Sequence, residues 1–244
     1  MNLVIDIGNT RTKYAVFNKS EEIFFTSTPK FELKEIHAII RKIPATEQCI
    51  LSATGNIEPS EIESLRKQFK VFLKLDHNVP MPFKSLYKTP ETLGLDRLAA
   101  ISAAQLLYRG KNVLIIDAGT AITFDFKNAN DEFIGGNISP GLEMRFKALN
   151  YYTEKLPLVK SDNKFSLLGL NTIEAITNGV QNGIIHEING IIRELDTIYE
   201  DLTVLLTGGD VQFFEIKLKR TIFVVQNLIC IGLNYILNYN VENS

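Results

Sequence analysis

Apolar residues in the first third of the chain recur at the spacings that strands and helices require. Residues 2–27 form three apolar stretches separated by short polar turns, which predicts an antiparallel meander because its neighbouring strands need only short loops. The elements expected next are a helix over 31–43, a strand over 49–51, a helix over 60–69 that Ser60 caps with Glu63, and a strand over 71–75. This order, βββαβαβ, is a mixed α/β pattern.

The second part of the chain, from about Lys111, repeats the pattern. Three apolar stretches at 113–117, 122–126 and 133–138 again predict neighbouring strands. A loop with three prolines over 76–91 and a helix over 95–108 precede them. The elements expected afterwards are a helix from Pro140 to 149, a mixed loop with local helix over 150–170, a helix over 172–199, a strand leading into a glycine turn over 203–210, a helix, a strand over 222–225 and a last helix through 239.

The long helix over 172–199 contains three interior glycines. Gly179, Gly183 and Gly190 are spaced by four and seven residues, so they share one helix face. Glycine costs about 1 kcal/mol in a helix interior, which favours a close backbone contact with another helix or a second subunit. A kinked helix is the alternative interpretation.

Two predicted strands end in the same Asp-x-Gly motif. Asp6 and Gly8 follow the apolar run Leu3–Ile5, and Asp117 and Gly119 follow a second run. A carboxylate at a strand end suits a hydrated divalent cation, and Lys13 offers a point charge for phosphate. An ordinary hairpin turn explains the first motif equally well when it is taken alone. Together with a later turn, Thr207–Asp210, the repeat favours a duplicated nucleotide-binding architecture.

Composition and charge exclude several other classes. The 244 residues carry a net charge of −2 and no block of Lys or Arg, so we expect no nucleic-acid partner. No apolar run is long enough to span a bilayer, and no basic leader precedes the first strand. Cys49 and Cys230 lie in apolar runs and are expected to be buried free thiols. We therefore expect a cytoplasmic protein without a membrane partner.

Taken together, the motifs resemble those of type III pantothenate kinases, in the acetate-kinase, sugar-kinase, Hsp70 and actin superfamily. They are DIGNT at 6–10 with Lys13, GLDR at 94–97, DAGTA at 117–121, GGNISPG at 135–141, NT at 171–172 and TGGD at 207–210. The resemblance implies an α/β fold with two related actin-like (ribonuclease-H-like) domains, residues 1–110 and 111–244. Each would hold a mixed five-stranded sheet, with ATP in the cleft between the domains.

The same resemblance implies an activity and its partners. The expected reaction is the ATP-dependent phosphorylation of pantothenate to 4′-phosphopantothenate, the first step of coenzyme A biosynthesis. Mg²⁺ would accompany ATP, and a monovalent cation, K⁺ or NH₄⁺, would be required. The family is dimeric, with the pantothenate pocket completed at the subunit interface, so a homodimer is expected.

The resemblance also assigns roles to individual residues. ATP binding falls to Asp6, Ile7, Gly8, Asn9, Thr10, Arg11, Thr12, Lys13 and Thr120, and the monovalent cation to Asp117. Pantothenate binding falls to Tyr87, Gly94, Leu95, Asp96, Arg97 and Thr172. A loop aromatic remains the alternative for Tyr87 and a helix N-cap for Thr172. The TGGD segment resembles the turn on the adenosine side of the ATP site, and GGNISPG is expected to shape the cleft. A tight turn before a helix is the alternative for each.

Asp96 is the candidate general base. It lies at the start of a predicted helix, where helix capping is the simpler explanation of a carboxylate. In the family the corresponding aspartate accepts the proton of the substrate hydroxyl. Arg97 could pair with a substrate carboxylate through its planar guanidinium, although an ordinary surface ion pair is the alternative.

Two other functions remain open from the sequence. One is a kinase of the same superfamily that acts on another small hydroxylated metabolite, although Asp96 with Arg97 suits a hydroxy acid. The other is a non-catalytic regulator that kept the fold. Three carboxylates, Asp6, Asp96 and Asp117, argue against a protein that only binds. A P-loop enzyme is excluded because the sequence has no GxxxxGK[ST] pattern.

Overall fold

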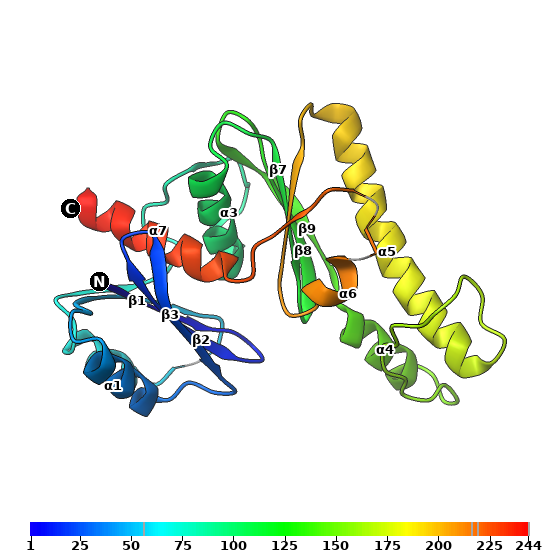
Figure 1. Ribbon diagram of the computed structural model, residues 1–244, viewed down its shortest axis with the longest axis horizontal. Coiled ribbons are helices and arrows are strands. Elements are labelled where there is room, and N and C mark those ends of the chain that lie inside the picture. The colour runs from blue at the N-terminus through cyan, green and yellow to red at the C-terminus, as the bar shows by residue number, and fades with distance from the viewer. Residues whose placement is uncertain (56, 216, 219, 244) are drawn as a thin grey trace. The chain divides into compact units, whose positions relative to one another are not determined.

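The computed structural model describes residues 1–55, 57–215, 217–218 and 220–243, which form two compact units (Figure 1). The first unit comprises Met1–Arg109, Asp131–Phe133 and Asn227–Ser244, and the second comprises Gly110–Asn130 and Ile134–Gln226. The last helix of the chain thus groups with the first unit. The division into domains 1–110 and 111–244 stays a prediction.

The first unit contains the predicted mixed five-stranded sheet. Its strands are β1 (Asn2–Ile7), β2 (Thr12–Asn18), β3 (Glu21–Thr28), β4 (Gln48–Ala53) and β5 (Val71–Lys74), in the order β3-β2-β1-β4-β5. The first three strands pair antiparallel, whereas β4 and β5 extend the sheet in parallel from β1. The predicted meander is therefore confirmed.

The two faces of this sheet bury different side chains. Leu3, Ile5 and Ile7 point into an apolar core with the helices α1 (Leu33–Lys42) and α2 (Pro59–Arg66). Because side chains alternate along a strand, Asn2 and Asp6 point to the opposite face. There the Asn2 side-chain amide donates to Oδ1 of Asn234, 2.8 Å away, on the last helix, α7 (Leu228–Glu242). Asp6 thus lies on the face that α7 covers.

Helix α3 (Leu95–Leu107) is anchored by a close crossing with α7. A Cβ atom built on Gly232 of α7 would lie 1.8 Å from the carbonyl oxygen of Ala99, so only glycine permits this approach. Every residue of α3 from Arg97 to Gln105 is buried. The start of α3, which carries Asp96, is consequently held in a fixed place within the first unit.

The second sheet repeats the strand order of the first. It consists of β7 (Val113–Ala118), β8 (Ala121–Lys127), β9 (Glu132–Pro140), β10 (Thr203–Thr207), β11 (Phe223–Val224) and β6 (Lys84–Ser85), in the order β11-β10-β7-β8-β9-β6. Strands β7 to β11 correspond one for one to β1 to β5. The two-residue β6 adds a sixth strand, which pairs with Glu132 and Phe133 at the start of β9. Two mixed sheets confirm the predicted α/β fold class.

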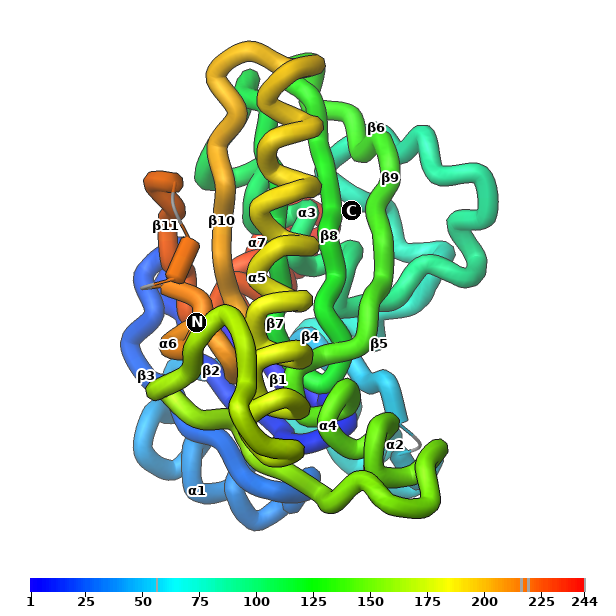
Figure 2. The backbone as a smooth tube through the Cα atoms, turned by 90° about the vertical axis from the view of Figure 1, so that its right-hand side faces the viewer, coloured from blue at the N-terminus to red at the C-terminus, as the bar shows by residue number. Residues whose placement is uncertain are grey.

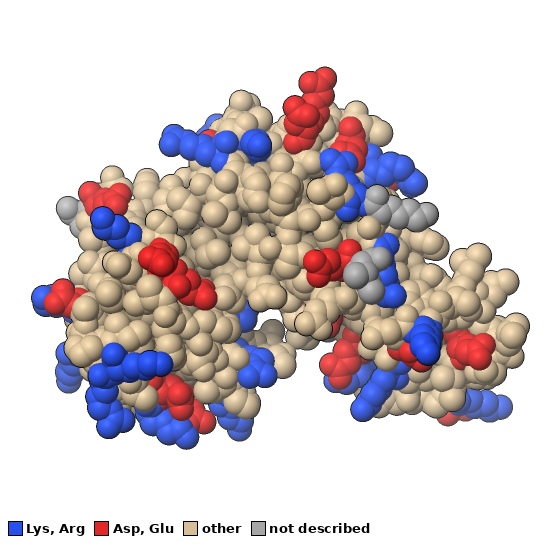
Figure 3. Space-filling model, viewed as in Figure 1, with Lys and Arg blue, Asp and Glu red and all other residues tan. Residues whose placement is uncertain are grey.

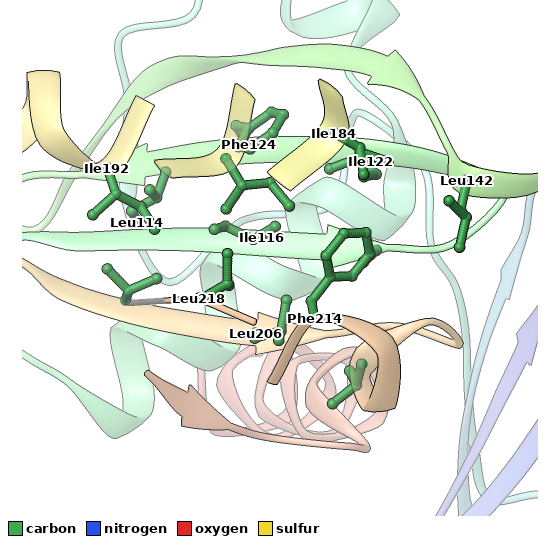
Figure 4. Close-up of a cluster of buried hydrophobic side chains, with 14 of the residues drawn as sticks. Leu114, Ile116, Ile122, Phe124, Leu142, Ile184, Ile192, Leu206, Phe214 and Leu218 are labelled. Carbon is green, nitrogen blue, oxygen red and sulfur yellow. The ribbon is translucent and has the colours of Figure 1, made fainter. Parts of the chain in front are cut away.

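Helix α5 (Thr172–Ile198) covers one face of the second sheet (Figure 2). Its residues Ile184 and Ile192 belong to the same apolar cluster as Leu114, Ile116 and Phe124 of the sheet, and Figure 4 shows them pointing toward one another. The remaining helices of this unit are α4 (Leu142–Tyr151) and α6 (Val211–Glu215), and a 3₁₀ turn at Pro90–Thr92 belongs to the first unit. The predicted long helix is confirmed.

Two predicted helix starts are wrong. Helix α2 begins at Pro59 and is capped by Glu58, which forms a capping box with Glu61, instead of by Ser60 with Glu63. Proline with its fixed φ is favoured in the first helical turn, so the N-cap lies two residues earlier than predicted. By contrast, Pro140 does not begin α4, because it ends β9, and Gly141 takes the N-cap position.

Two further expectations need correction. Among the described residues 152–171 the structure has no helix, so the local helix expected there is absent. The glycines of α5 also make no close contact within the described chain, because Cβ atoms built on Gly179, Gly183 and Gly190 would meet no atom within 4 Å. The predicted backbone contact is therefore absent within the described part of one chain, and a contact with a second subunit stays a prediction. Both cysteines are buried free thiols, as predicted.

Candidate functional site

Asp6 is the last residue but one of β1, where it is buried and lies opposite Lys13. Its side chain pairs across the sheet with Lys13, whose Nζ lies 3.8 Å from Oδ2, and Asp6 as a residue is 6% exposed. Burial raises the pKa of Asp6 from 3.8 to about 6 because it disfavours the charged form; Lys13 opposes this shift, and the charge of Asp96 adds to it. A buried carboxylate beside a lysine is suited to bind a cation together with phosphate.

The turn after Asp6 presents its polar residues to solvent. The N–H of Gly8 donates to the carbonyl oxygen of Arg11 at 3.0 Å, which closes the turn. The Arg11 guanidinium in turn donates to Oγ and the carbonyl oxygen of Ser27 on β3. Asn9 and Thr10 are exposed, whereas Ile7 and Thr12 bury their side chains. Ile7 and Thr12 belong to the predicted ATP-binding run, but they could reach a ligand only through their backbone atoms.

Asp96 lies in the first turn of α3, in the same unit as Asp6. Gly94 is the N-cap residue and makes no side-chain bond, while Oδ1 of Asp96 accepts a hydrogen bond of 2.8 Å from the N–H of Arg97. The carboxylate therefore satisfies one of the free donors of the helix start without being the N-cap. The charge of Asp96 contributes to the raised pKa of Asp6, so these two of the three predicted carboxylates lie in the same part of the first unit.

Arg97 is buried against two aromatic rings. It is 5% exposed, and its guanidinium carbon lies 5.5 Å from the ring centre of Tyr87 and 5.9 Å from that of Phe133. The two rings stack with centres 5.7 Å apart. This burial is unlike that of an ordinary surface ion pair, and cation–π contacts of this kind orient a guanidinium. Tyr87, Asp96 and Arg97, predicted to bind one substrate, thus lie together.

Sequence reasoning missed Phe133. The pairing of β6 with the start of β9 places it beside Arg97, and the N–H of Leu86 donates to the carbonyl oxygen of Phe133 at 2.9 Å. An ion pair of 2.6 Å between Lys84 and Glu132 joins the same two strands. A two-residue strand has no periodicity, so no signal in the sequence could have revealed this neighbour.

Three predicted turns converge at one edge of the second sheet. The N–H of Gly141 donates to the carbonyl oxygen of Thr120, and the N–H of Asp210 to that of Ala118. Gly208 has φ +102°, and a Cβ atom there would lie 2.2 Å from the carbonyl oxygen of Ala118 and 2.6 Å from Oδ1 of Asp117. The motifs DAGTA, SPG and TGGD are therefore packed backbone to backbone around Asp117, and only glycine fits at position 208.

Arg145, which sequence reasoning also missed, braces the SPG turn. Its guanidinium donates to the carbonyl oxygen of Pro140 at 2.8 Å and to Oγ of Ser139 at 2.9 Å, and it forms an ion pair with Glu187 of α5. These bonds fix the turn whose Gly141 contacts the Thr120 loop. Nothing in the sequence distinguishes Arg145 from any other arginine on a helix, so this role could not be predicted.

Thr172 is the first residue of α5 and lines a cavity. The N-cap is the preceding residue, Asn171, whose Oδ1 accepts from the N–H of Glu174 at 3.0 Å, so Thr172 is not the cap. The cavity has a volume of about 850 Å³ and lies between α4 and α5. Most of its lining is apolar and includes Leu149 and Tyr152. Thr172 belongs to the second unit, as do Asp117 and Thr120.

The carboxylates of Asp6 and Asp117 suit a cation that keeps most of its bound water. Within the described residues there is no group of three or more His, Cys, Asp or Glu side chains placed to enclose a metal ion. Asp6 and Asp117 are each the last residue but one of a strand. Mg²⁺ typically binds through one or two carboxylates and several waters, together with substrate phosphates. The residues present therefore fit hydrated Mg²⁺ better than a closed metal centre.

The helices and the surface charge bear on membrane and nucleic-acid binding. The described helices include none that is both long and apolar enough to cross a membrane. On the face that Figure 3 shows, basic and acidic side chains are interspersed. The surface seen there lacks the continuous basic stripe that would be typical of nucleic-acid binding.

Comparison with known protein families matches residues 2–194 to type III pantothenate kinase. The chain belongs to the type III pantothenate kinase family. A type III pantothenate kinase from Christiangramia forsetii is 46% identical over 98% of this chain and 99% of its own length. Another from Phocaeicola vulgatus is 43% identical over 98% of this chain and 99% of its own length. Membership thus extends over nearly the whole chain.

Solved structures that resemble this type III pantothenate kinase family member support its fold. A conserved Campylobacter jejuni protein, assigned to the Baf family of transcriptional activators, has a TM-score of 0.65 at 21% identity and covers 98% of this chain and 99% of its own. A glucokinase from an Antarctic psychrotroph has a TM-score of 0.51 at 13% identity, with 98% of both chains covered. These likenesses confirm the predicted actin-like fold.

Proposed function

We propose that this protein transfers the γ-phosphoryl group of ATP to the primary hydroxyl of pantothenate, which gives 4′-phosphopantothenate in the first step of coenzyme A biosynthesis. Membership in the type III pantothenate kinase family over nearly the whole chain is the observation that carries the proposal. The reaction needs a base for the hydroxyl, charge to hold the phosphates, and a pocket that orients a hydroxy acid.

Asp96 is the proposed general base. Its carboxylate takes the proton of the pantothenate hydroxyl as that oxygen attacks the phosphorus. The support is geometric: Asp96 lies at the anchored start of α3, near Asp6, and its Oδ1 is oriented by the N–H of Arg97. A second oxygen of the carboxylate remains to accept the proton. A positioned base of this kind contributes about 10²–10⁴-fold in rate.

The ATP end of the site is assigned to the turn after β1 and to Thr120. The ATP-binding residues are Asp6, Ile7, Gly8, Asn9, Thr10, Arg11, Thr12, Lys13 and Thr120. Lys13 and the backbone N–H groups of the turn would hold phosphate oxygens, and Asp6 would help to hold the Mg²⁺ that accompanies ATP. Asp117 takes the monovalent cation, K⁺ or NH₄⁺, because a carboxylate oxygen packed against glycine backbone is a fixed oxygen ligand. Bound cations neutralise the charge that develops on the transferred group.

The pantothenate end is assigned to the aromatic and basic cluster around Arg97. The substrate residues are Tyr87, Gly94, Leu95, Asp96, Arg97 and Thr172. Arg97, held by Tyr87 and Phe133, pairs with the substrate carboxylate through two parallel hydrogen bonds. Gly94 keeps the backbone beside Asp96 free of a side chain, which leaves room for the Asp96 carboxylate.

A homodimer is the proposed assembly, with Thr172 reaching the pantothenate of the partner subunit. Three features support it. The cavity beside Thr172 is mostly apolar, Cβ atoms built on the three glycines of α5 would meet no atom of the described chain within 4 Å, and Tyr151, Tyr152 and Leu170 are exposed. Exposed apolar surface of this kind marks interaction sites.

We also propose that the protein is cytoplasmic and that it consists of two domains, 1–110 and 111–244, which hold ATP between them.

The test is ADP release with pantothenate, Mg²⁺·ATP and K⁺ or NH₄⁺, with each component omitted in turn. Release that requires both pantothenate and the monovalent cation supports the proposal. Release of ADP with another hydroxylated metabolite, but not with pantothenate, would identify a kinase of the same superfamily that acts on a different substrate. No release across a panel of metabolites, with ATP still bound, would favour a regulator.

A further inference from the structure

Arg145 of α4 bonds to three consecutive residues of the turn that joins β9 to α4. Its backbone N–H donates to the carbonyl oxygen of Gly141 at 3.1 Å. Its guanidinium donates to the carbonyl oxygen of Pro140 at 2.8 Å and to Oγ of Ser139 at 2.9 Å. A planar guanidinium carries several donors in a fixed arrangement, so this one side chain can fix the position of the whole turn.

The turn is packed against the loop that contains Thr120. Thr120 is exposed and lies at the tip of the hairpin between β7 and β8. The N–H of Gly141 donates to the carbonyl oxygen of Thr120 at 3.1 Å. A Cβ atom built on Gly141 would lie 2.1 Å from the carbonyl oxygen of Gly119 and 2.4 Å from that of Thr120. Backbone segments in such close contact move together, so Arg145 sets the position of Thr120 through Gly141.

Glu187 of α5 connects the guanidinium of Arg145 to the core. The two side chains form an ion pair in which Arg145 is 21% and Glu187 is 30% exposed. A partly buried pair is screened by salt less than a fully exposed one. Ile184 and Ile188 of the same helix are buried in the apolar core of the second unit. The ion pair therefore joins a fixed helix to the turn that contacts Thr120.

Arg220 is a second arginine of this unit with similar partners. It forms an ion pair with Asp196 of α5 and donates to the carbonyl oxygen of Leu202 at 2.6 Å. Leu202 precedes the amino end of β10, whereas Thr120 follows the carboxyl end of β7, which runs parallel to β10. The two arginines thus bond at opposite edges of the same sheet, and Arg145 is at the edge that carries Thr120.

We propose that Arg145 is a positioning residue that, together with Glu187, holds Thr120 in place for the phosphates of ATP. The inference rests on the proposed function, because it takes Thr120 to be part of the ATP site. Arg145 acts through Gly141 and does not itself bind the nucleotide. Loss of a hydrogen bond to a charged group such as phosphate weakens binding by about 10-fold or more. Arg145 should therefore affect the affinity for ATP without affecting that for pantothenate.

The test measures two dissociation constants by calorimetry, one for a non-hydrolysable ATP analogue with Mg²⁺ and one for pantothenate. Arg145→Lys keeps a positive charge for Glu187, but one ammonium group does not reproduce the planar fork that reaches Pro140 and Ser139. We expect the ATP analogue to bind about 10-fold more weakly and pantothenate to bind as in the wild type. Arg220→Lys, the matched control, should leave both constants unchanged.

A double-mutant cycle tests whether the effect passes through Thr120. Thr120→Ala should weaken binding of the ATP analogue, and adding Arg145→Lys should weaken it little further, because both changes remove the same contact. Effects that multiply would overturn the inference, as would wild-type affinity for the analogue in Arg145→Lys. Weakened pantothenate binding alone would also overturn it, and would assign Arg145 to the cavity that it lines with Thr172.

Ser139→Ala provides a milder variant, because it removes one bond of the Arg145 guanidinium and leaves the others. It should weaken binding of the ATP analogue by a smaller factor than Arg145→Lys, with a melting temperature close to that of the wild type. If the wild-type protein binds the analogue but not pantothenate, the proposed substrate fails, while the nucleotide constants still decide the role of Arg145. If it binds no analogue, both proposals fail.

Discussion

Gly94 and Asp96 are so close that a side chain at position 94 would displace the Asp96 carboxylate. A Cβ atom built on Gly94 would lie 2.4 Å from Oδ1 of Asp96, well inside the contact distance of the two atoms. The atom that must move is the far end of a flexible side chain, not the backbone. The glycine of the GLDR segment therefore sets the position of the proposed base.

This relationship predicts the effect of Gly94→Ala. The added methyl group should displace the Asp96 carboxylate while leaving α3 in place, because Arg97 and the residues that follow remain buried. A displacement of about 1 Å can cost about 10²-fold in rate, so kcat should fall by that order with little change in melting temperature. Steady-state kinetics and calorimetry measure the two quantities.

Gly55→Ala is the matched control, since a Cβ atom on Gly55, in the same unit, would meet no atom of the described residues within 4 Å. It should retain wild-type kcat. A Gly94→Ala variant with wild-type kcat would show that the position of the Asp96 carboxylate is unimportant.

Asp96→Asn tests the base itself. Asparagine has the same shape and can still accept from the N–H of Arg97, but it cannot take a proton. We expect kcat to fall by about 10²–10⁴-fold, while the dissociation constant of pantothenate changes little. Quenched-flow measurement of ADP and calorimetric titration of pantothenate separate the two effects. Retained turnover would reject Asp96 as the base.

Much of the fold could be predicted from the sequence because its strands are apolar and end in recognisable turns. The runs that end at Asp6 and Asp117 are nearly continuous apolar segments, and both became central strands of their sheets. Helix starts were harder, because Pro59 and Pro140 are equally compatible with a first helical turn. Only the pairing of β9 decides that Pro140 ends a strand.

The site was predictable only where chemistry follows directly from a motif. Asp6, Lys13 and Asp96 stand in short motifs, and the structure brings them together. Phe133 carries no such mark, because its relevance arises from strand pairing between segments far apart in sequence.

The raised pKa of Asp6 predicts that this residue lowers the stability of the ligand-free protein. Its folded pKa of about 6 exceeds its ordinary value of 3.8, so the unfolded chain loses this proton first as pH rises. The native state is therefore progressively destabilised between these two pH values, and the full cost remains above them.

Asp6→Asn should consequently raise the melting temperature at pH 8 and change it little at pH 3.5. The shift in pKa corresponds to at most about 3 kcal/mol at the higher pH. Thermal unfolding at several pH values measures the difference, with the exposed Glu91→Gln as a control that should follow the wild type. A variant less stable than the wild type at pH 8 would contradict the burial argument, because it would mean that the charged carboxylate stabilises the native state.

Asp117→Asn tests the monovalent cation. Oδ1 of Asp117 is confined by the backbone at Gly208 and Gly119, so the oxygen is held in place for an ion. Asparagine keeps the shape but loses the negative charge that makes the oxygen a strong ligand for K⁺ or NH₄⁺. The wild-type rate should rise with either cation, whereas that of the variant should respond weakly. Initial rates with choline chloride at equal ionic strength provide the baseline. An Asp117→Asn response that matched the wild type at every concentration would place the cation elsewhere.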